Sequence, residues 1–476
     1  MSSFLTNFVI RLQELSGVDG AVAFTASARV VSIVSSIGTV LLMVHFLSPV
    51  EQGYYYALLS LFLFQTMAEA GFSFVVQQYT AHESALCKFL PDGGIEGDPI
   101  AHSRLASVLQ LAVRWYSAAS LLITAILLPI GFYFFSHRSQ DGGNVEWQGP
   151  WVAAVLASAI SFLVVPIYSF LEGCGQIREV AAARFAQSVA VLLASWFTMI
   201  THHGLYAPAM VNVSVVLAAV AFLVPRIPLL LGLLRHGSDR YAISWRSEIW
   251  PFQWKLATSW IFTYMITQMF TPVLFLTRGP VEAGRMGMSV NVVAYLPILV
   301  LSWITTKTTP FGQLIKLGRL GELDRLFSRA LRQSLGVLLL LEAACMGGVI
   351  AVRHLFPHFA ERVETPAVFG FLLLTAIGTF AVQSMGIYLR SFKEEPFLVQ
   401  SMVVAALTTV AIVITASGWG ALGMSVGYFL ANGVIGLAWA IVIFCSKTRH
   451  YCRTAASRVA EQSDEPQVEA GESLVL

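Results

Sequence analysis

Charge is scarce in this chain. Only 12% of its 476 residues are Asp, Glu, Lys or Arg, whereas 56% are hydrophobic. Soluble globular domains carry about 25% charged residues, so a soluble enzyme of this length would lack the charged shell that surrounds a core. The same composition excludes a disordered chain, a collagen and a coiled coil. The class that remains is a polytopic membrane protein.

Signatures of catalysis and metal binding are also missing. The chain has no HExxH sequence and no phosphate loop, and its five cysteines lack the spacing of metal ligands or of a disulfide framework. No basic stripe for nucleic acid and no removable signal peptide is found. We therefore expect no enzymatic activity, no cofactor, no metal site and no nucleic-acid partner.

Long apolar runs, in contrast, recur along the whole chain. A transmembrane helix needs about 20 mostly apolar residues. Twelve runs meet this length, at 24–47, 54–79, 115–135, 151–172, 179–201, 205–234, 251–276, 284–304, 334–356, 366–389, 396–416 and 419–446. They are apolar throughout, whereas a spanning barrel would show alternating segments of about ten residues. The sequence predicts an all-α membrane protein with twelve transmembrane helices.

The basic residues predict the orientation. With a cytoplasmic N-terminus, 21 of the 29 Lys and Arg residues fall on inner segments and only five on outer loops. The five outer residues are Arg138, Arg278, Arg285, Arg353 and Arg362. Because inner loops carry the excess of basic residues, we expect both termini to be cytoplasmic.

Two short sequence echoes indicate an internal duplication. The turn FLSPVEQG at 46–53 is echoed by FLTRGPVEAG at 275–284, and the segment 204–210 is echoed at 418–424. Both echoes fall at corresponding places in a layout of six plus six spans. Two parallel six-helix halves are related by an axis along the membrane normal, which places a cavity between them.

This layout predicts the domain organisation. The expected parts are a cytoplasmic interfacial segment at 1–23, an N-terminal six-helix lobe at 24–234, a cytoplasmic linker at 235–250, a C-terminal six-helix lobe at 251–446 and a disordered cytoplasmic tail at 447–476. Residues 305–333 additionally alternate an apolar and a basic side, which predicts a cytoplasmic surface helix or, alternatively, a solvated linker.

The first two spans resemble a known family. The stretch 46–81, with its FLSPVEQG turn and the segment Glu69-Ala70-Gly71, resembles the polysaccharide or oligosaccharide flippases of the multidrug/oligosaccharidyl-lipid/polysaccharide (MOP) exporter superfamily. The turn at 172–177 is similar to the short glycine-bearing turn of that family. The resemblance implies alternating-access translocation of lipid-diphosphate-linked oligosaccharide repeat units across a bacterial inner membrane, for O-antigen, exopolysaccharide or capsule. It implies a polyprenyl-diphosphate-linked oligosaccharide, membrane lipids, a polysaccharide polymerase and other pathway proteins as partners.

A polar stripe on the first span is the main candidate for substrate contact. Arg29, Ser32, Ser36 and Thr39 are spaced by three or four residues, so they share one helical face with Thr25. An arginine inside a membrane is costly, and its planar fork matches a diphosphate. Snorkelling to the cytoplasmic headgroups is the alternative role for Arg29.

The second span supplies Gln65 and Glu69 on one face, and Glu69 lies at a depth that permits a pair with Arg29. Glu69 is therefore a candidate for the cavity wall, for ion coupling or for a structural pair. Glu342, eight residues inside the ninth span, is the second coupling candidate.

The seventh span is the counterpart of the first in the proposed duplication. It carries Lys255, Ser259, Thr263 and Gln268, which we predict to line the cavity. An ordinary interfacial anchor is the alternative role for Lys255, because tryptophans lie beside it.

Two other functions remain open. A cation-coupled multidrug exporter of the same superfamily also has twelve spans, but it typically carries an acid in the first span, where this chain has Arg29. The lipid II flippase of the superfamily has fourteen spans, two more than are predicted here. An integral membrane polysaccharide polymerase is the alternative of another class.

Overall fold

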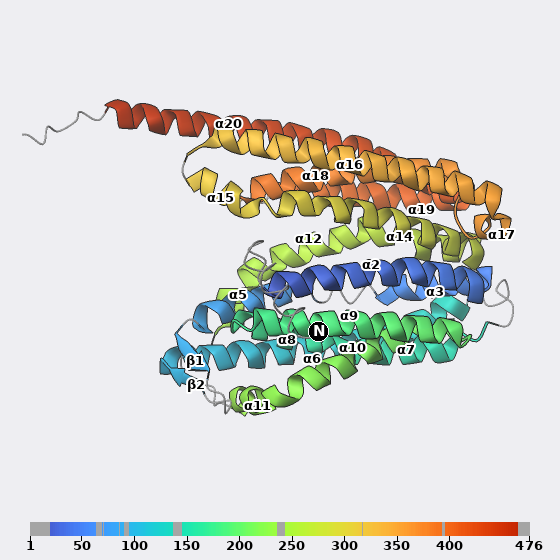
Figure 1. The fold of residues 1–476 in the computed structure, drawn as a ribbon, viewed down its shortest axis with the longest axis horizontal. Helices are drawn as coiled ribbons and strands as arrows, with labels where there is room; N and C mark the ends of the chain where they lie inside the picture. Colours follow the sequence, from blue (N-terminus) through green and yellow to red (C-terminus); the bar gives the residue numbers. More distant parts are fainter. Residues whose placement is uncertain are drawn as a thin grey trace, which may run out of the picture. The chain divides into compact units, whose positions relative to one another are not determined.

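The computed structural model describes residues 20–62, 69, 71–84, 86–89, 95–136, 145–235, 243–316, 318–392 and 396–464 (Figure 1). Helices make up nearly all of this part of the chain, and the only strands within it are the short pair β1 (Cys87–Phe89) and β2 (Ile95–Gly97). Of the predicted interfacial segment 1–23, residues 1–19 lie outside the described residues, and the rest belongs to the first helix.

The chain divides into two compact units. The first comprises Met1–Met288, His358–Glu364 and Ala416–Ala421, and the second comprises Ser289–Pro357, Thr365–Thr415 and Leu422–Leu476. This division does not fall at the predicted linker 235–250, because the first unit continues to Met288. The two six-helix lobes therefore stay a prediction.

The helices of the first unit run from α2 to α13. They are α2 (Gly20–Phe46), α3 (Pro49–Phe62), α5 (Phe72–Ser84), α6 (Pro99–Ser136), α7 (Gln148–Phe162), α8 (Val164–Gly173), α9 (Ile177–Ile200), α10 (Ala207–Leu223), α11 (Ile227–Arg235), α12 (Trp250–Gln268) and α13 (Phe270–Arg278), with single turns η1 (Gly204–Tyr206), η2 (Val224–Arg226) and η3 (Trp245–Ile249). Helix α14 (Pro280–Thr305) begins in the first unit and continues into the second.

The second unit contains the remaining helices. They are α15 (Thr308–Lys316), α16 (Leu320–Leu355), the start of α17 (Pro357–Ala360), α18 (Pro366–Arg390), α19 (Leu398–Tyr428), the π-helical segment η4 (Phe429–Gly436) and α20 (Leu437–Asp464).

Nine helical stretches in the described part of the chain are long and apolar enough to cross a membrane. One of them, Leu398–Tyr451, has 54 residues and would be about 80 Å long, far more than a bilayer of about 30 Å needs. Gly420, with a positive φ of 58°, interrupts it at the start of the predicted twelfth span. The predicted second and seventh spans correspond to the shorter pairs α3–α5 and α12–α13. The chain is an all-α polytopic membrane protein, as predicted.

Aromatic side chains form much of the core of the first unit. Tyr54 on α3 stacks on Phe135 at 5.6 Å and meets Phe275 on α13 edge-on at 5.1 Å. Trp151 on α7 lies against Gly131, where an added Cβ atom would come within 2.0 Å of the indole ring. The close approach of α6 and α7 therefore requires glycine at this position.

The core of the second unit corrects one prediction from the sequence. The apolar side of the predicted surface helix 305–333 is buried: Leu323 and Phe327 on α16 pack into this core. Phe327 contacts Tyr388 on α18 at 4.8 Å and Phe444 on α20 at 5.7 Å between ring centroids. An amphipathic pattern fits a protein partner as well as a membrane surface, and here the partner is protein.

The predicted disordered tail is also partly wrong. Helix α20 runs without interruption from the membrane span to Asp464, so 447–464 are helical. The remaining residues of the predicted tail, 465–476, lie outside the described residues.

Candidate functional site

Helix α2 carries the predicted polar stripe and presents two different surfaces. Val30, Ile37 and Leu41 are exposed on one side of the helix. At about 100° per residue, the stripe that contains Arg29 and Ser32 is centred about 140° away from them, and Arg29 itself lies about 100° away. Both of these polar residues are exposed as well. The exposed polar side and the exposed apolar side therefore face in different directions.

The hydroxyl groups of this stripe have partners. Ser32 Oγ donates to the Ala28 carbonyl at 2.8 Å, and Ser36 Oγ donates to the Ser32 carbonyl at 2.9 Å. Such bonds within a helix satisfy a hydroxyl inside a membrane and leave its oxygen free to accept another bond. Thr39 Oγ1 lies 3.2 Å from Ser195 Oγ on α9, so the C-terminal end of the stripe contacts a neighbouring helix.

Helix α9 packs along one flank of α2 and fixes its rotation. An added Cβ atom at Gly38 would come within 2.2 Å of the Trp196 ring, so glycine is required for this contact. Near the other end of the interface, the rings of Phe24 and Phe185 lie 6.1 Å apart. These contacts hold α2 in one rotation about its axis and therefore fix the direction in which its polar stripe faces.

The predicted pair between Arg29 and Glu69 is not among the ion pairs of the described residues. Glu69 instead accepts a hydrogen bond from Ser73 Oγ, one turn further along the chain. Its carboxylate also acts electrostatically on Tyr116, which is fully buried on α6. The second residue predicted on this span, Gln65, lies outside the described residues.

The remaining predicted site residues lie on α12 and α16. The side chains of Lys255, Ser259 and Thr263 lie outside the described part of α12, and Gln268 is half-buried at its last position. Glu342 is 5% exposed near the middle of the apolar part of α16. Its Oε1 has no hydrogen-bond partner within the described residues. An unpaired buried carboxyl is costly when ionised, so its role in coupling stays a prediction.

The structure adds a network that the sequence did not predict, at the C-terminal end of α2. Arg362 donates to the carbonyls of Leu47 at 2.5 Å and Val44 at 3.4 Å. Gln52, which is 1% exposed, donates to the carbonyls of Arg362 and Gly284, both at 3.0 Å. Burial lowers the pKa of Arg362 from its usual value. A guanidinium beside the last carbonyls of a helix is favoured by the helix dipole.

A second network joins the end of α13 and the start of α14 to the segments 416–421 and 358–364. Arg278 donates to the carbonyls of Ala416 at 3.1 Å and Gly418 at 2.7 Å. Glu282 accepts a hydrogen bond of 2.9 Å from the Ala421 backbone. Arg285 binds the Glu361 carbonyl at 2.7 Å. Three of the five predicted outer arginines, Arg278, Arg285 and Arg362, thus bind backbone carbonyls. Their position on outer loops, where basic residues are few, was the feature of the sequence that could have indicated this role.

A third charged network lies where the predicted linker meets α6. Arg104 binds Glu83 at 2.7 Å and Glu248 at 2.9 Å. The Ser244 backbone donates to Glu248 at 3.0 Å, and this bond, together with Arg104, lowers the pKa of the Glu248 carboxyl. Trp245 stacks on Trp115 at 4.8 Å. The described end of the linker is therefore attached to the first unit immediately before α12.

One pattern that resembles a hydrolase nucleophile has a structural explanation. Residues 423–427 read Gly-Met-Ser-Val-Gly, but they lie within the helix. Ser425 is fully buried and its hydroxyl donates to the Leu422 carbonyl at 2.9 Å. A nucleophile elbow requires an exposed serine on a strand-to-helix turn, which this segment does not provide.

Comparisons with known proteins identify the fold. No family model and no curated protein sequence matches the chain. An inward-facing multidrug resistance MATE family transporter of the MOP superfamily is similar over 90% of this chain and 99% of its own, with a TM-score of 0.61 and 12% identity. A MOP superfamily transporter from Pyrococcus furiosus, described as having a binding pocket of reverse polarity, covers 90% of this chain and 97% of its own, at 0.53 and 13%.

The lipid II flippase MurJ, in an inward closed conformation, is similar over 93% of both chains, with a TM-score of 0.51 and 12% identity. All three are described as transporters or flippases rather than enzymes. At these identities the likeness concerns the fold alone. The chain has the fold of the MOP superfamily of membrane transporters.

Proposed function

We propose that this protein is a flippase that moves lipid-diphosphate-linked oligosaccharide repeat units across the bacterial inner membrane by alternating access. The MOP fold supports a transporter, and the likeness to a lipid II flippase supports a lipid-linked substrate. The observation that carries the proposal is the position of Arg29. It is exposed on the polar stripe of α2, about 100° around the helix from the exposed apolar residues.

The chemistry of the substrate explains why such a cation is needed. A diphosphate cannot cross hydrocarbon unaided, because an isolated charge loses far more solvation than an apolar medium returns. A planar guanidinium binds two phosphate oxygens at once, and the hydroxyls of Ser32 and Ser36 supply further polar contacts. The polyprenyl tail remains in the bilayer while the head group follows this route. Glu69, Gln65, Lys255, Ser259, Thr263 and Gln268 are further candidates for it.

The decisive test replaces Arg29 in a strain that depends on this protein for surface polysaccharide. Arg29→Ala should abolish the polysaccharide and cause lipid-linked repeat units to accumulate, with normal protein in the membrane. Arg29→Lys should restore only part of the export, since lysine keeps the charge but loses the fork. Arg184→Ala removes the same charge from a side chain that is 51% exposed and lies 3.0 Å from Glu172, and it should export normally.

Normal export by Arg29→Ala would assign Arg29 to the membrane interface and would overturn its role. A second candidate function is multidrug export, which the higher TM-score to the MATE transporter favours. Helix α2, however, contains no Asp or Glu that could bind a coupling cation. Loss of drug tolerance with unchanged surface polysaccharide in a deletion strain would establish that function instead.

A further inference from the structure

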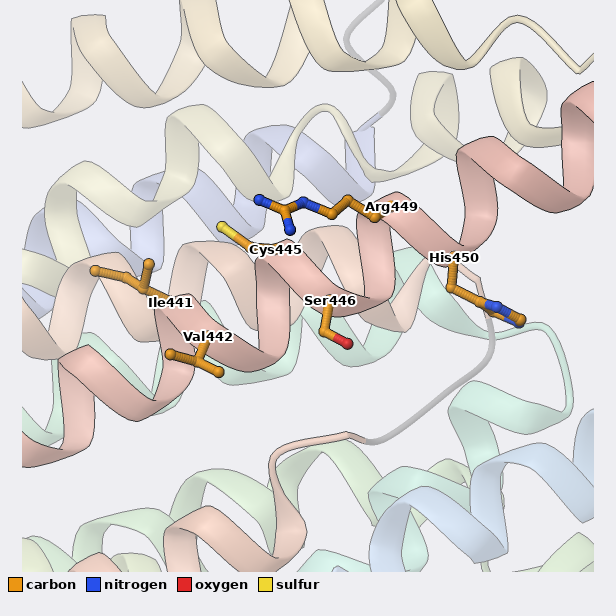
Figure 2. A pocket seen from close by; sticks show the side chains of 6 residues that line it. All are labelled: Ile441, Val442, Cys445, Ser446, Arg449 and His450. Atoms are coloured by element: carbon orange, nitrogen blue, oxygen red, sulfur yellow. The ribbon is translucent and has the colours of Figure 1, made fainter.

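Helix α20 has one face packed against the second unit and one face that is open. On the packed face, Phe444 contacts Tyr388 at 5.2 Å, and Tyr451 stacks on Phe392 at 4.1 Å. The open face lines a cavity of about 620 Å³ (Figure 2). The described residues that line it are Ile441, Val442, Cys445, Ser446, Arg449 and His450, all of them exposed.

The polarity of this open face changes along the helix. It is aliphatic at Ile441 and Val442 and cationic at Arg449, and the rise of 1.5 Å per residue separates these parts by about 11 Å. Ser446 lies between them, at the predicted end of the last span. The change from apolar to charged therefore falls at the expected boundary between hydrocarbon and head groups.

The acidic residues of α20, Glu461 and Asp464, lie at its C-terminal end, 12 or more residues after Arg449. Between 437 and 460 the chain contains Lys447, Arg449, Arg453 and Arg458 but neither Asp nor Glu. Two acidic residues of α16 bind other groups. Asp324 accepts a hydrogen bond from the Tyr388 hydroxyl, and Glu322 forms an ion pair with Arg319 at 3.5 Å. A run of basic residues directly after a transmembrane helix attracts anionic lipids, at about 1 kcal/mol per Lys or Arg.

We propose that the open face of α20 binds an anionic phospholipid of the surrounding leaflet. Arg449 and Ser446 donate hydrogen bonds to its phosphate, and one acyl chain lies along Ile441 and Val442. Both ends of the lipid then find complementary surface, because the charged end meets the guanidinium and the apolar end meets aliphatic side chains. This site is separate from the polar stripe of α2 and does not depend on which substrate is transported.

The test measures lipid binding to the purified full-length protein in detergent, by native mass spectrometry with added phosphatidylglycerol or phosphatidylcholine. Phosphatidylglycerol should bind in preference. Arg449→Ala should weaken its binding about fivefold, the value of one interfacial cation. Lys447→Ala is the matched control, because it removes the same charge from the half-buried side of the helix and should leave the preference unchanged.

A second measurement locates the lipid without changing the charge. A spin label on Cys445, with the other four cysteines replaced by serine, should contact lipid labelled near its head group in phosphatidylglycerol vesicles, and Arg449→Ala should reduce that contact. Equal weakening by Arg449→Ala and Lys447→Ala would mean only diffuse attraction and would overturn the site. Preferential binding of a polyprenyl diphosphate over phosphatidylglycerol would overturn it in favour of a substrate site.

Discussion

The two echoed turns have nearly the same sequence but are held in different ways. At 46–53 the glutamate is used locally: Ser48 and Glu51 form a capping box, with bonds of 2.7 and 3.2 Å, that starts α3. The arginine that binds the preceding carbonyls comes from a distant segment, as Arg362. The first turn is thus bound by an arginine from a distant segment, whereas its own glutamate binds within the turn.

The second turn reverses both roles. Its two additional residues are Arg278 and Gly279, and Gly279 adopts a φ of 95° that permits the sharp turn. Arg278 reaches out to the carbonyls of another segment. Glu282, the counterpart of Glu51, binds the Ala421 backbone beside Gly420. The two inserted residues thus include the arginine with which the second turn binds its neighbour.

The largest expected effect concerns the close contact between the two turns. Alanine at Gly53 would place a Cβ atom 1.9 Å from the Pro280 carbonyl oxygen, a backbone atom that cannot move alone. We expect Gly53→Ala to lower the free energy of unfolding by about 3 kcal/mol, as overpacking does. Gly284→Ala meets the Gly53 nitrogen at 2.8 Å and should cost less.

Thermal unfolding of the detergent-solubilised protein measures both changes. Gly336→Ala is the matched control, because nothing lies within 4 Å of an added Cβ atom on that helix. It should be neutral or slightly stabilising, since alanine is the better helix former. Equal unfolding temperatures for Gly53→Ala and Gly336→Ala would disprove the close contact of the two turns.

The second prediction compares the two arginines. Arg362 is half-buried and binds the end of α2, whereas Arg278 is exposed. Hydrogen bonds to charged groups contribute about 1.5–3 kcal/mol when protected from water and less when exposed. We expect Arg362→Ala to cost about 2 kcal/mol and Arg278→Ala about 1 kcal/mol in the same unfolding measurement.

Arg319→Ala serves as the reference for an exposed pair, since Arg319 and its partner Glu322 are 60% and 52% exposed. It should change stability by less than about 0.5 kcal/mol. A cost for Arg278→Ala that equals or exceeds that of Arg362→Ala would reverse the proposed difference between the two turns.

The membrane spans could be predicted from the sequence because hydropathy is a local property. The turn at 46–53 was likewise predicted from local turn residues, whereas the interruption at Gly420 lies just after the predicted gap at 417–418, inside the predicted twelfth span. The contact of Arg362 with Leu47 could not, because it joins residues 315 positions apart. A single sequence is sufficient to predict that an arginine lies in a loop, but it does not show which helix end that arginine contacts.

Other differences arose because one pattern fits two environments. The apolar side that contains Leu323 and Phe327 has the same period whether it meets a membrane surface or α18 and α20. The helix at 447–464 is polar and lies after a membrane span, so composition alone favoured disorder. For the candidate site, the spacing of the stripe on α2 was sufficient to group Arg29 with Ser32. It did not reveal that Glu69 binds Ser73.

The smallest expected effect concerns the charged network at the end of the linker. The lowered pKa of Glu248 means that its carboxylate is stabilised in the folded protein, chiefly by the Ser244 backbone and also by Arg104. Its contribution is complete above the ordinary carboxyl pKa and is lost as the pH falls through the lowered folded-state value. Glu248→Gln should therefore reduce stability near pH 7 by less than about 1 kcal/mol, because the pair is partly exposed. The difference from the unmodified protein should stay constant from pH 7 to the ordinary carboxyl pKa of 4.5 and should shrink as unfolding is measured below it. Glu322→Gln, at the exposed pair on α16, should change stability near pH 7 by less than about 0.5 kcal/mol. A difference for Glu248→Gln that grows on acidification would mean that this carboxylate destabilises the folded linker.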